Sequence, residues 1–173
     1  LLPSGPGKGT RCVTELRFDR NVKTSIKLLP VETRESPRSL EQLVADESQW
    51  RSIQFDSDNA ESTARALAAL SETKRISLSD AVSWGLHREG VAVPAGESDS
   101  TLVDVPRWRY AIVNYPHPLL DAGMVIIDTP GRSPRAKDAN TQWQSLLRVI
   151  APDETHLVVP ATLRPDAVPA LVA

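Results

Sequence analysis

The amino-acid sequence predicts an α/β fold in which a helical insertion interrupts a mixed sheet. Two runs near the N-terminus, 11–18 and 21–29, alternate apolar and polar residues and are rich in β formers. Residues 36–90 contain several stretches that favour helix. The last third alternates strand, helix and strand patterns, which is typical of a parallel sheet.

Length and composition are those of an ordinary globular domain. The chain has 173 residues, enough for one domain with a hydrophobic core. Its net charge of −2 gives no electrostatic attraction for nucleic acid, so we expect no nucleic-acid partner. Cys12 is the single cysteine, which fits a reducing compartment, and we expect a cytoplasmic location. Because the chain begins with Leu1 and not with Met, we expect a piece of a larger polypeptide.

The first half predicts a hairpin and then helices. The two N-terminal runs flank the short polar stretch "DRN", so we predict that they pair as a β-hairpin, followed by a polar loop over 31–39. Helices are predicted for three stretches: 39–53, 59–72 and 77–86. Asn59 is the expected N-cap of the second, and Ser77 or Ser79 that of the third. Residues 87–106 are rich in Gly, Pro and Ser and predict a loop.

The second half predicts strands at 107–116, 123–131 and 155–161, with a helix at 140–150. The strand over 123–131 begins with a nearly continuous apolar run, which indicates burial on both faces.

An acidic residue and a glycine follow this apolar run. Asp128 ends the predicted strand, at the carboxyl edge where open α/β sheets bind ligands. Its carboxylate can hold Mg²⁺, usually through water, and Gly131 can place a backbone N–H beside a terminal phosphate. Together they form the D-x-x-G pattern of nucleoside triphosphatases. The alternative is that Asp128 only caps a turn.

A glycine-rich stretch, "GPGKGT" at 5–10, precedes the first predicted strand. It is not the phosphate-gripping loop G-x-x-x-x-G-K-[ST], because Leu2 stands in place of the first glycine and Gly9 in place of Ser or Thr. Guanine-nucleotide switches use a loop threonine upstream of D-x-x-G, and Thr10 has that place. The alternatives are a flexible polar loop, and Thr14 as the switch threonine, although its alternating position places Thr14 inside the strand.

Residues 1–131 resemble the GTPase domain of bacterial dynamin-like proteins. The matching pieces are "LP" at 2–3, a glycine-rich switch I ending in "TR" at 10–11, "YPH" at 115–117 and "DTPG" at 128–131. The resemblance implies an incomplete P-loop GTPase-like fold of three layers, with a mixed sheet and a helical insertion at 36–90.

The resemblance also implies a chemistry and partners. It implies a GTPase that binds GTP and Mg²⁺, in which Gly9, Thr10, Asp128 and Gly131 contact the nucleotide. Thr10 and Asp128 would lie on the Mg²⁺ side, with Thr10 the catalytic switch residue. Guanine nucleotide is the implied partner. Homo-oligomerisation and peripheral membrane association, through parts outside these residues, are implied as well.

A second resemblance begins near residue 124. Residues 124–173 are similar to signal-recognition-particle GTPases of the flagellar type, in "DTPGRS" at 128–133 and in the strand at 154–162. This resemblance implies protein targeting or flagellar assembly. We therefore divide the chain into 1–131 and 132–173. The alternatives are a chimera joined at the shared D-T-x-G and a natural dynamin-like variant.

Two motifs of such GTPases do not occur in the 173 residues. The phosphate-gripping loop would lie before Leu1, and a guanine-reading N-K-x-D or T-K-x-D motif after Ala173. We therefore expect the isolated chain to bind GTP weakly or not at all, and to be inactive. One sheet face would be uncovered, which predicts exposed apolar surface and self-association. A nucleotide-independent interaction domain is the alternative of another class.

Overall fold

The computed structural model describes residues 12–87 and 102–129. The chain divides into two compact units, Leu1–Pro130 and Gly131–Ala173, and every described residue belongs to the first. The helix and the strand predicted within the second unit lie outside the described residues.

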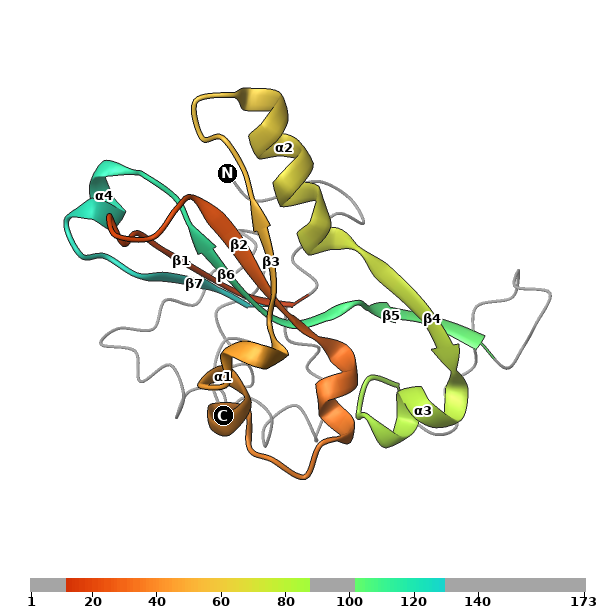
Figure 1. Ribbon diagram of the computed structural model, residues 1–173. Coiled ribbons are helices and arrows are strands. Elements are labelled where there is room, and N and C mark those ends of the chain that lie inside the picture. The colour runs from red at the N-terminus through yellow and green to blue at the C-terminus, as the bar shows by residue number, and fades with distance from the viewer. Residues whose placement is uncertain (1–11, 88–101, 130–173) are drawn as a thin grey trace, which may run out of the picture. The chain divides into compact units, whose positions relative to one another are not determined.

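Five strands form a mixed sheet (Figure 1). They are β1 (Val13–Arg17), β2 (Ser25–Pro30), β3 (Arg51–Gln54), β6 (Trp108–Asn114) and β7 (Ile126–Asp128). Their order across the sheet is β3-β2-β6-β1-β7. β1 and β6 are parallel, whereas the other neighbouring pairs are antiparallel. The mixed sheet predicted from the sequence is therefore present.

The hairpin predicted for the two N-terminal runs is wrong, because β6 lies between β1 and β2. Alternation shows which face a strand buries, but it does not show which strand lies beside it. The seven residues of β6 are nearly all buried, so this strand takes the central place in the sheet.

The connection between β1 and β2 is fixed by Asn114, the last residue of β6. The buried Asn114 amide donates from Nδ2 to the carbonyl oxygens of Val22 at 2.9 Å, Asp19 at 3.2 Å and Lys23 at 3.3 Å. Its Oδ1 accepts from the backbone N–H of Asp19 at 2.7 Å. The side chain of Asn114 thereby supplies hydrogen-bond partners for backbone groups of the β1–β2 connection, which lies outside the strands.

Two further strands, β4 (Thr73–Ser77) and β5 (Leu102–Pro106), form a separate antiparallel ribbon. Neither was predicted. β4 lies between two stretches assigned to helices, and β5 lies at the end of the stretch assigned to a loop. The alternation of Val103 and Val105 was the available signal for β5, and both are buried. They belong to a second core cluster: Val31, Ile76, Ala81, Trp84, Val103 and Val105.

The helices are short and mostly capped by polar side chains. The α-helices are α1 (Leu40–Val44), α2 (Ala60–Ala68), α3 (Leu78–Ser83) and α4 (Pro118–Asp121), and the 3₁₀ helices are η1 (Val31–Glu35), η2 (Glu47–Gln49) and η3 (Ala69–Ser71). Asn59 caps α2 by accepting from the backbone N–H groups of Glu61 and Ser62, as predicted. Ser77 is the cap of α3, which decides between the two predicted serines.

The helix predicted over 39–53 is wrong beyond Val44. The chain leaves α1 at that residue, forms η2 and continues as the edge strand β3. Asp46 caps η2 with its carboxylate, which interrupts the helical path. The apolar spacing that suggested a long helix instead places Ile53 opposite Ile26 of β2.

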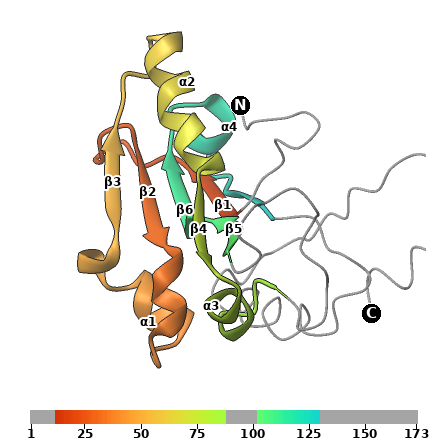
Figure 2. The same ribbon diagram turned by 90° about the vertical axis from the view of Figure 1, so that its right-hand side faces the viewer.

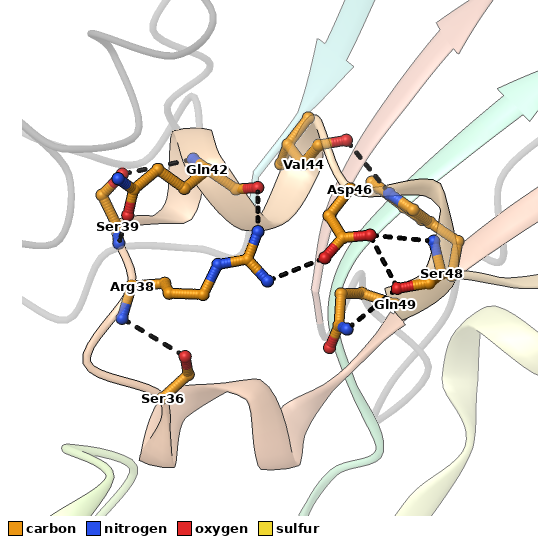
Figure 3. A network of polar contacts seen from close by, with 9 residues as sticks. Ser36, Arg38, Ser39, Gln42, Val44, Asp46, Ser48 and Gln49 are labelled. Atoms are coloured by element: carbon orange, nitrogen blue, oxygen red, sulfur yellow. Dashed lines mark hydrogen bonds and ion pairs between the residues drawn. The ribbon is translucent and has the colours of Figure 1, made fainter.

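A polar network holds α1 and η2 together (Figure 3). Ser39 and Gln42 form a reciprocal capping box at the start of α1. The Arg38 guanidinium donates to the Asp46 carboxylate at 2.7 Å and to the Gln42 carbonyl at 3.0 Å. Hydrogen bonds from Ser48 and Arg38 lower the pKa of Asp46 to about 2.

The main core lies on one face of the five-stranded sheet. Its buried residues from the strands are Leu16, Ile26, Leu28, Trp108, Ala111 and Val113, and Cys12 joins them from the position just before β1. They pack against α2 and η3, and the Trp108 indole donates to the Ala69 carbonyl at 2.8 Å. Figures 1 and 2 show α2 and α1 towards opposite ends of the strands.

Candidate functional site

Asp128 is the one predicted site residue that the structure places. It is the last residue of β7, and it lies opposite Thr14 of the antiparallel neighbour β1. Figure 1 shows β7 beside β1 at the edge of the sheet. The side chain is half-buried. The carboxylate therefore lies near the start of β1, where the chain arrives from residue 11.

Two residues near Asp128 are buried: Cys12, just before β1, and Thr14, within it. Burial is the main reason that the pKa of the Cys12 thiol is raised to about 11; a hydrogen bond with Thr14 lowers this pKa in part, and the negative charge of Asp128 adds to the rise. Cys12 is 3% exposed, so its thiol stays protonated near neutral pH and is a poor nucleophile.

Thr14 has no exposure at all, which confirms its predicted place inside the strand. Its hydroxyl donates to the Cys12 carbonyl at 3.3 Å. Because this hydroxyl is committed to the backbone and sealed from solvent, Thr14 does not fit the role of a switch threonine.

The other predicted site residues, Gly9, Thr10 and Gly131, lie outside the described residues. In the chain, Thr10 precedes Cys12 by two positions and Gly131 follows Asp128 by three. The described part of the structure thus brings together Asp128 and the segment that directly follows Thr10. It does not place Thr10 itself.

The described residues offer few ligands for Mg²⁺. Among residues 12–87 and 102–129, no group of three or more His, Cys, Asp or Glu side chains is arranged to hold a metal ion. Asp128 supplies a single carboxylate. Mg²⁺ is commonly bound by one or two carboxylates together with substrate phosphates and water. Asp128 fits a site of that kind, but it does not fit a metal site built from protein ligands alone.

β7 is not buried on both faces, so that prediction is wrong. Met124, Val125 and Ile126 are 48%, 51% and 42% exposed, and Leu119 of α4 is 51% exposed. Within the described residues β7 is an edge strand with β1 as its partner. A continuous apolar run shows that a strand can be buried, but it does not supply the partner that buries it. The self-association that exposed apolar surface favours stays a prediction.

A cavity of about 250 Å³ lies elsewhere, where the ends of the two sheets meet. It is lined by Pro30, Glu32, Arg51, Thr73, Lys74, Arg107 and Trp108. Lys74 pairs with Glu32 at 2.6 Å, and Arg107 pairs with Glu72 at 3.4 Å. No residue predicted to contact nucleotide lines this cavity.

Comparison with known proteins adds one decisive finding. The model of a family described as the dynamin family matches residues 1–161. The chain belongs to the dynamin family. No curated protein and no solved structure gives a significant match.

Membership of the dynamin family has consequences for the predictions. It supports a GTP-binding, GTPase-type α/β domain, and the mixed sheet is consistent with such a domain. The match continues to residue 161, beyond the predicted boundary at 131. The resemblance of 132–173 to signal-recognition-type GTPases is not confirmed and stays a prediction. No helix of the described residues is both long and apolar enough to cross a membrane.

Proposed function

We propose that this dynamin-family chain supplies the switch I and D-x-x-G parts of a GTP site. The observation that carries the proposal is the position of Asp128, which ends β7 opposite Thr14. Thr14 follows Thr10 by four positions in the chain. The family match supports GTP as the nucleotide. In this proposal Asp128 holds Mg²⁺ and Gly131 donates its backbone N–H to the γ-phosphate. Gly9 lies against the phosphates, and the Thr10 hydroxyl contacts both Mg²⁺ and the γ-phosphate.

The roles follow from the chemistry of each group. Bound Mg²⁺ would neutralise charge on the β- and γ-phosphates. Asp128 is half-buried at the end of β7, opposite Thr14 near the start of β1. Glycine at positions 9 and 131 lets the backbone approach phosphate without a Cβ in the way. Thr10 would release when the γ-phosphate is lost, which is how a switch loop reports hydrolysis.

By themselves, the 173 residues are proposed to be inactive. They contain neither G-x-x-x-x-G-K-[ST] nor a guanine-reading N-K-x-D or T-K-x-D pattern. The main donors to the β- and γ-phosphates are therefore missing from this sequence. We further propose a cytoplasmic location, self-association and peripheral membrane contact through other parts of the protein. The division at residue 131, with a signal-recognition-type second segment, is part of the same proposal.

A fluorescent GTP analogue titrated with Mg²⁺ tests this function. We expect weak binding by the unmodified chain and no phosphate release above background. Fusing a strand, P-loop and helix upstream of Leu1 should strengthen binding, and Asp128→Asn should then weaken it about tenfold or more, as expected when a charged contact is lost. Asp104→Asn is the matched control, because Asp104 is exposed on β5 of the other sheet.

Three outcomes would contradict the proposal. Equal affinity of the fusion and its Asp128→Asn variant would remove Asp128 from the nucleotide site. Absence of binding by the fusion would favour a nucleotide-independent interaction domain. Sustained phosphate release by the unmodified chain would show that the sequence holds a complete catalytic site.

A further inference from the structure

Two arginines from different elements lie together beside the second core cluster. Arg34 belongs to η1, and its Nη1 donates to the carbonyl of Trp84, the C-terminal cap of α3, at 3.1 Å. Arg109 belongs to β6, and its Nη1 donates to the carbonyl of Thr33 at 3.0 Å. Both side chains are anchored by backbone carbonyls, and both are only partly exposed.

Within the part of the chain that the structure describes, no carboxylate compensates the two positive charges of the pair. Arg34 Nε is buried and has no hydrogen-bond partner among the described residues. Burial, and then the nearby charge of Arg109, lower the pKa of Arg34 to about 10. Burial lowers the pKa of Arg109 as well. Partly desolvated cations that repel each other are costly unless an anion compensates them.

Seven other basic side chains of the described residues form ion pairs with carboxylates. The ion pairs are Arg17–Glu15, Arg20–Asp121, Lys27–Glu47, Arg38–Asp46, Arg65–Glu61, Lys74–Glu32 and Arg107–Glu72. Within residues 12–87 and 102–129, no carboxylate acts on Arg34 or Arg109. Among the described residues, these two partly buried cations therefore lack a neighbouring carboxylate, although an uncompensated charge costs more when it is buried than when it is exposed.

We propose that Arg34 and Arg109 together bind a phosphate group. A guanidinium presents a fork of N–H donors, and carbonyl anchoring through one nitrogen leaves donors of each arginine for an oxyanion. A phosphate dianion carries enough charge to balance both arginines, whereas a carboxylate balances one. This site uses none of the residues assigned to the proposed GTP site, and the inference does not depend on that proposal.

Inorganic phosphate is the probe for the 173-residue chain. Thermal unfolding is followed in increasing potassium phosphate and, at matched ionic strength, in potassium chloride and potassium acetate. We expect a saturable rise in the midpoint with phosphate alone. Arg34→Met and Arg109→Met should each weaken the apparent affinity about tenfold or more, because each removes a charge-assisted contact. Arg65→Met is the control, since Arg65 is an exposed arginine of α2, and it should keep the phosphate effect.

A second measurement needs no variant to fold. The Nε–H resonances of Arg34 and Arg109 in the unmodified chain should shift with phosphate, while that of Arg65 should not.

Vesicles of phosphatidylcholine with and without phosphatidic acid then separate a lipid phosphate from free phosphate as the source. Binding to the acidic vesicles that Arg34→Met removes supports the lipid source, and phosphate binding without vesicle binding supports the free ion.

Three results would overturn the site. One is unmoved Nε–H resonances at saturating phosphate. Another is equal stabilisation by phosphate of Arg34→Met, Arg109→Met and Arg65→Met, which would show a general ionic effect. The third is stabilisation by acetate equal to that by phosphate, which would assign the pair to a carboxylate.

Discussion

β6 and the stretch 124–127, which leads into β7, are both rich in apolar residues but have opposite environments. β6 is the middle strand of five and is buried along nearly its whole length. β7 forms one edge of the described sheet, and Met124, Val125 and Ile126 at its start are exposed. The difference arises from their neighbours. β6 has β1 and β2 on its two sides, while β7 has β1 on one side within the described residues. Apolar content therefore indicates a capacity for burial, and the pairing decides whether it is used.

The largest effect that would sharpen this contrast is expected at Asn114. Asn114→Ala should lower the free energy of unfolding by about 3 kcal/mol, because buried backbone groups of the β1–β2 connection lose their partner. Urea unfolding followed by far-UV circular dichroism measures it. Asn21→Ala is the control, since Asn21 is exposed, and a loss of stability there equal to that of Asn114→Ala would refute the assigned role.

A matched pair of valines tests the contrast directly. Val113 of β6 has no exposure, and Val125 beside β7 is 51% exposed. Val113→Ala should cost about 2 kcal/mol through lost burial and a residual cavity. Val125→Ala should change stability by no more than about 0.5 kcal/mol. The same urea titration measures the free energy of unfolding of both variants. An equal loss in both would mean that Val125 is covered in solution.

The smallest effect is expected for an ion pair between the β6–β7 connection and the β1–β2 connection. Asp121 of α4 pairs with Arg20 at 2.6 Å, and hydrogen bonding to Arg20 lowers the pKa of Asp121 below its ordinary value of 3.8. This stabilisation is present above the ordinary pKa and is lost as pH falls through the lowered one. Asp121→Asn should flatten the acid limb of the stability curve slightly. Arg20→Met should do the same, and an unchanged limb in both would show that the pair contributes nothing.

The sequence predicted individual elements better than their pairing. Asn59 and the serine cap of α3 were found because capping is a local interaction between a side chain and its own helix. The strand predicted at 107–116 is present as β6. The β1–β6–β2 arrangement was missed because strand neighbours are chosen over long separations in the chain, for which a single sequence has no signal.

The candidate site was predicted in type more than in detail. Asp128 ends a strand as expected, but that strand is an antiparallel edge and not a buried one. The roles of Gly9, Thr10 and Gly131 stay predictions. The Arg34–Arg109 pair could not have been found in the sequence, because it forms only when η1 is placed against β6, and neither arginine lies in a pattern that predicts the other.

The central position of β6 has a consequence for the order in which the chain acquires its structure. The Tyr110 hydroxyl of β6 donates a hydrogen bond to the Glu15 carboxylate, 95 residues earlier in the chain. β2 also pairs with β6. On the ribosome, β1, β2 and β3 are all made before the strand that joins β1 to β2, so the early strands wait with open edges until Asn114 has emerged. α2 and its Asn59 cap use only nearby residues and can form first. Sheet closure is then a late, long-range event, and it is the step at which a nascent chain of this kind is most exposed to wrong partners.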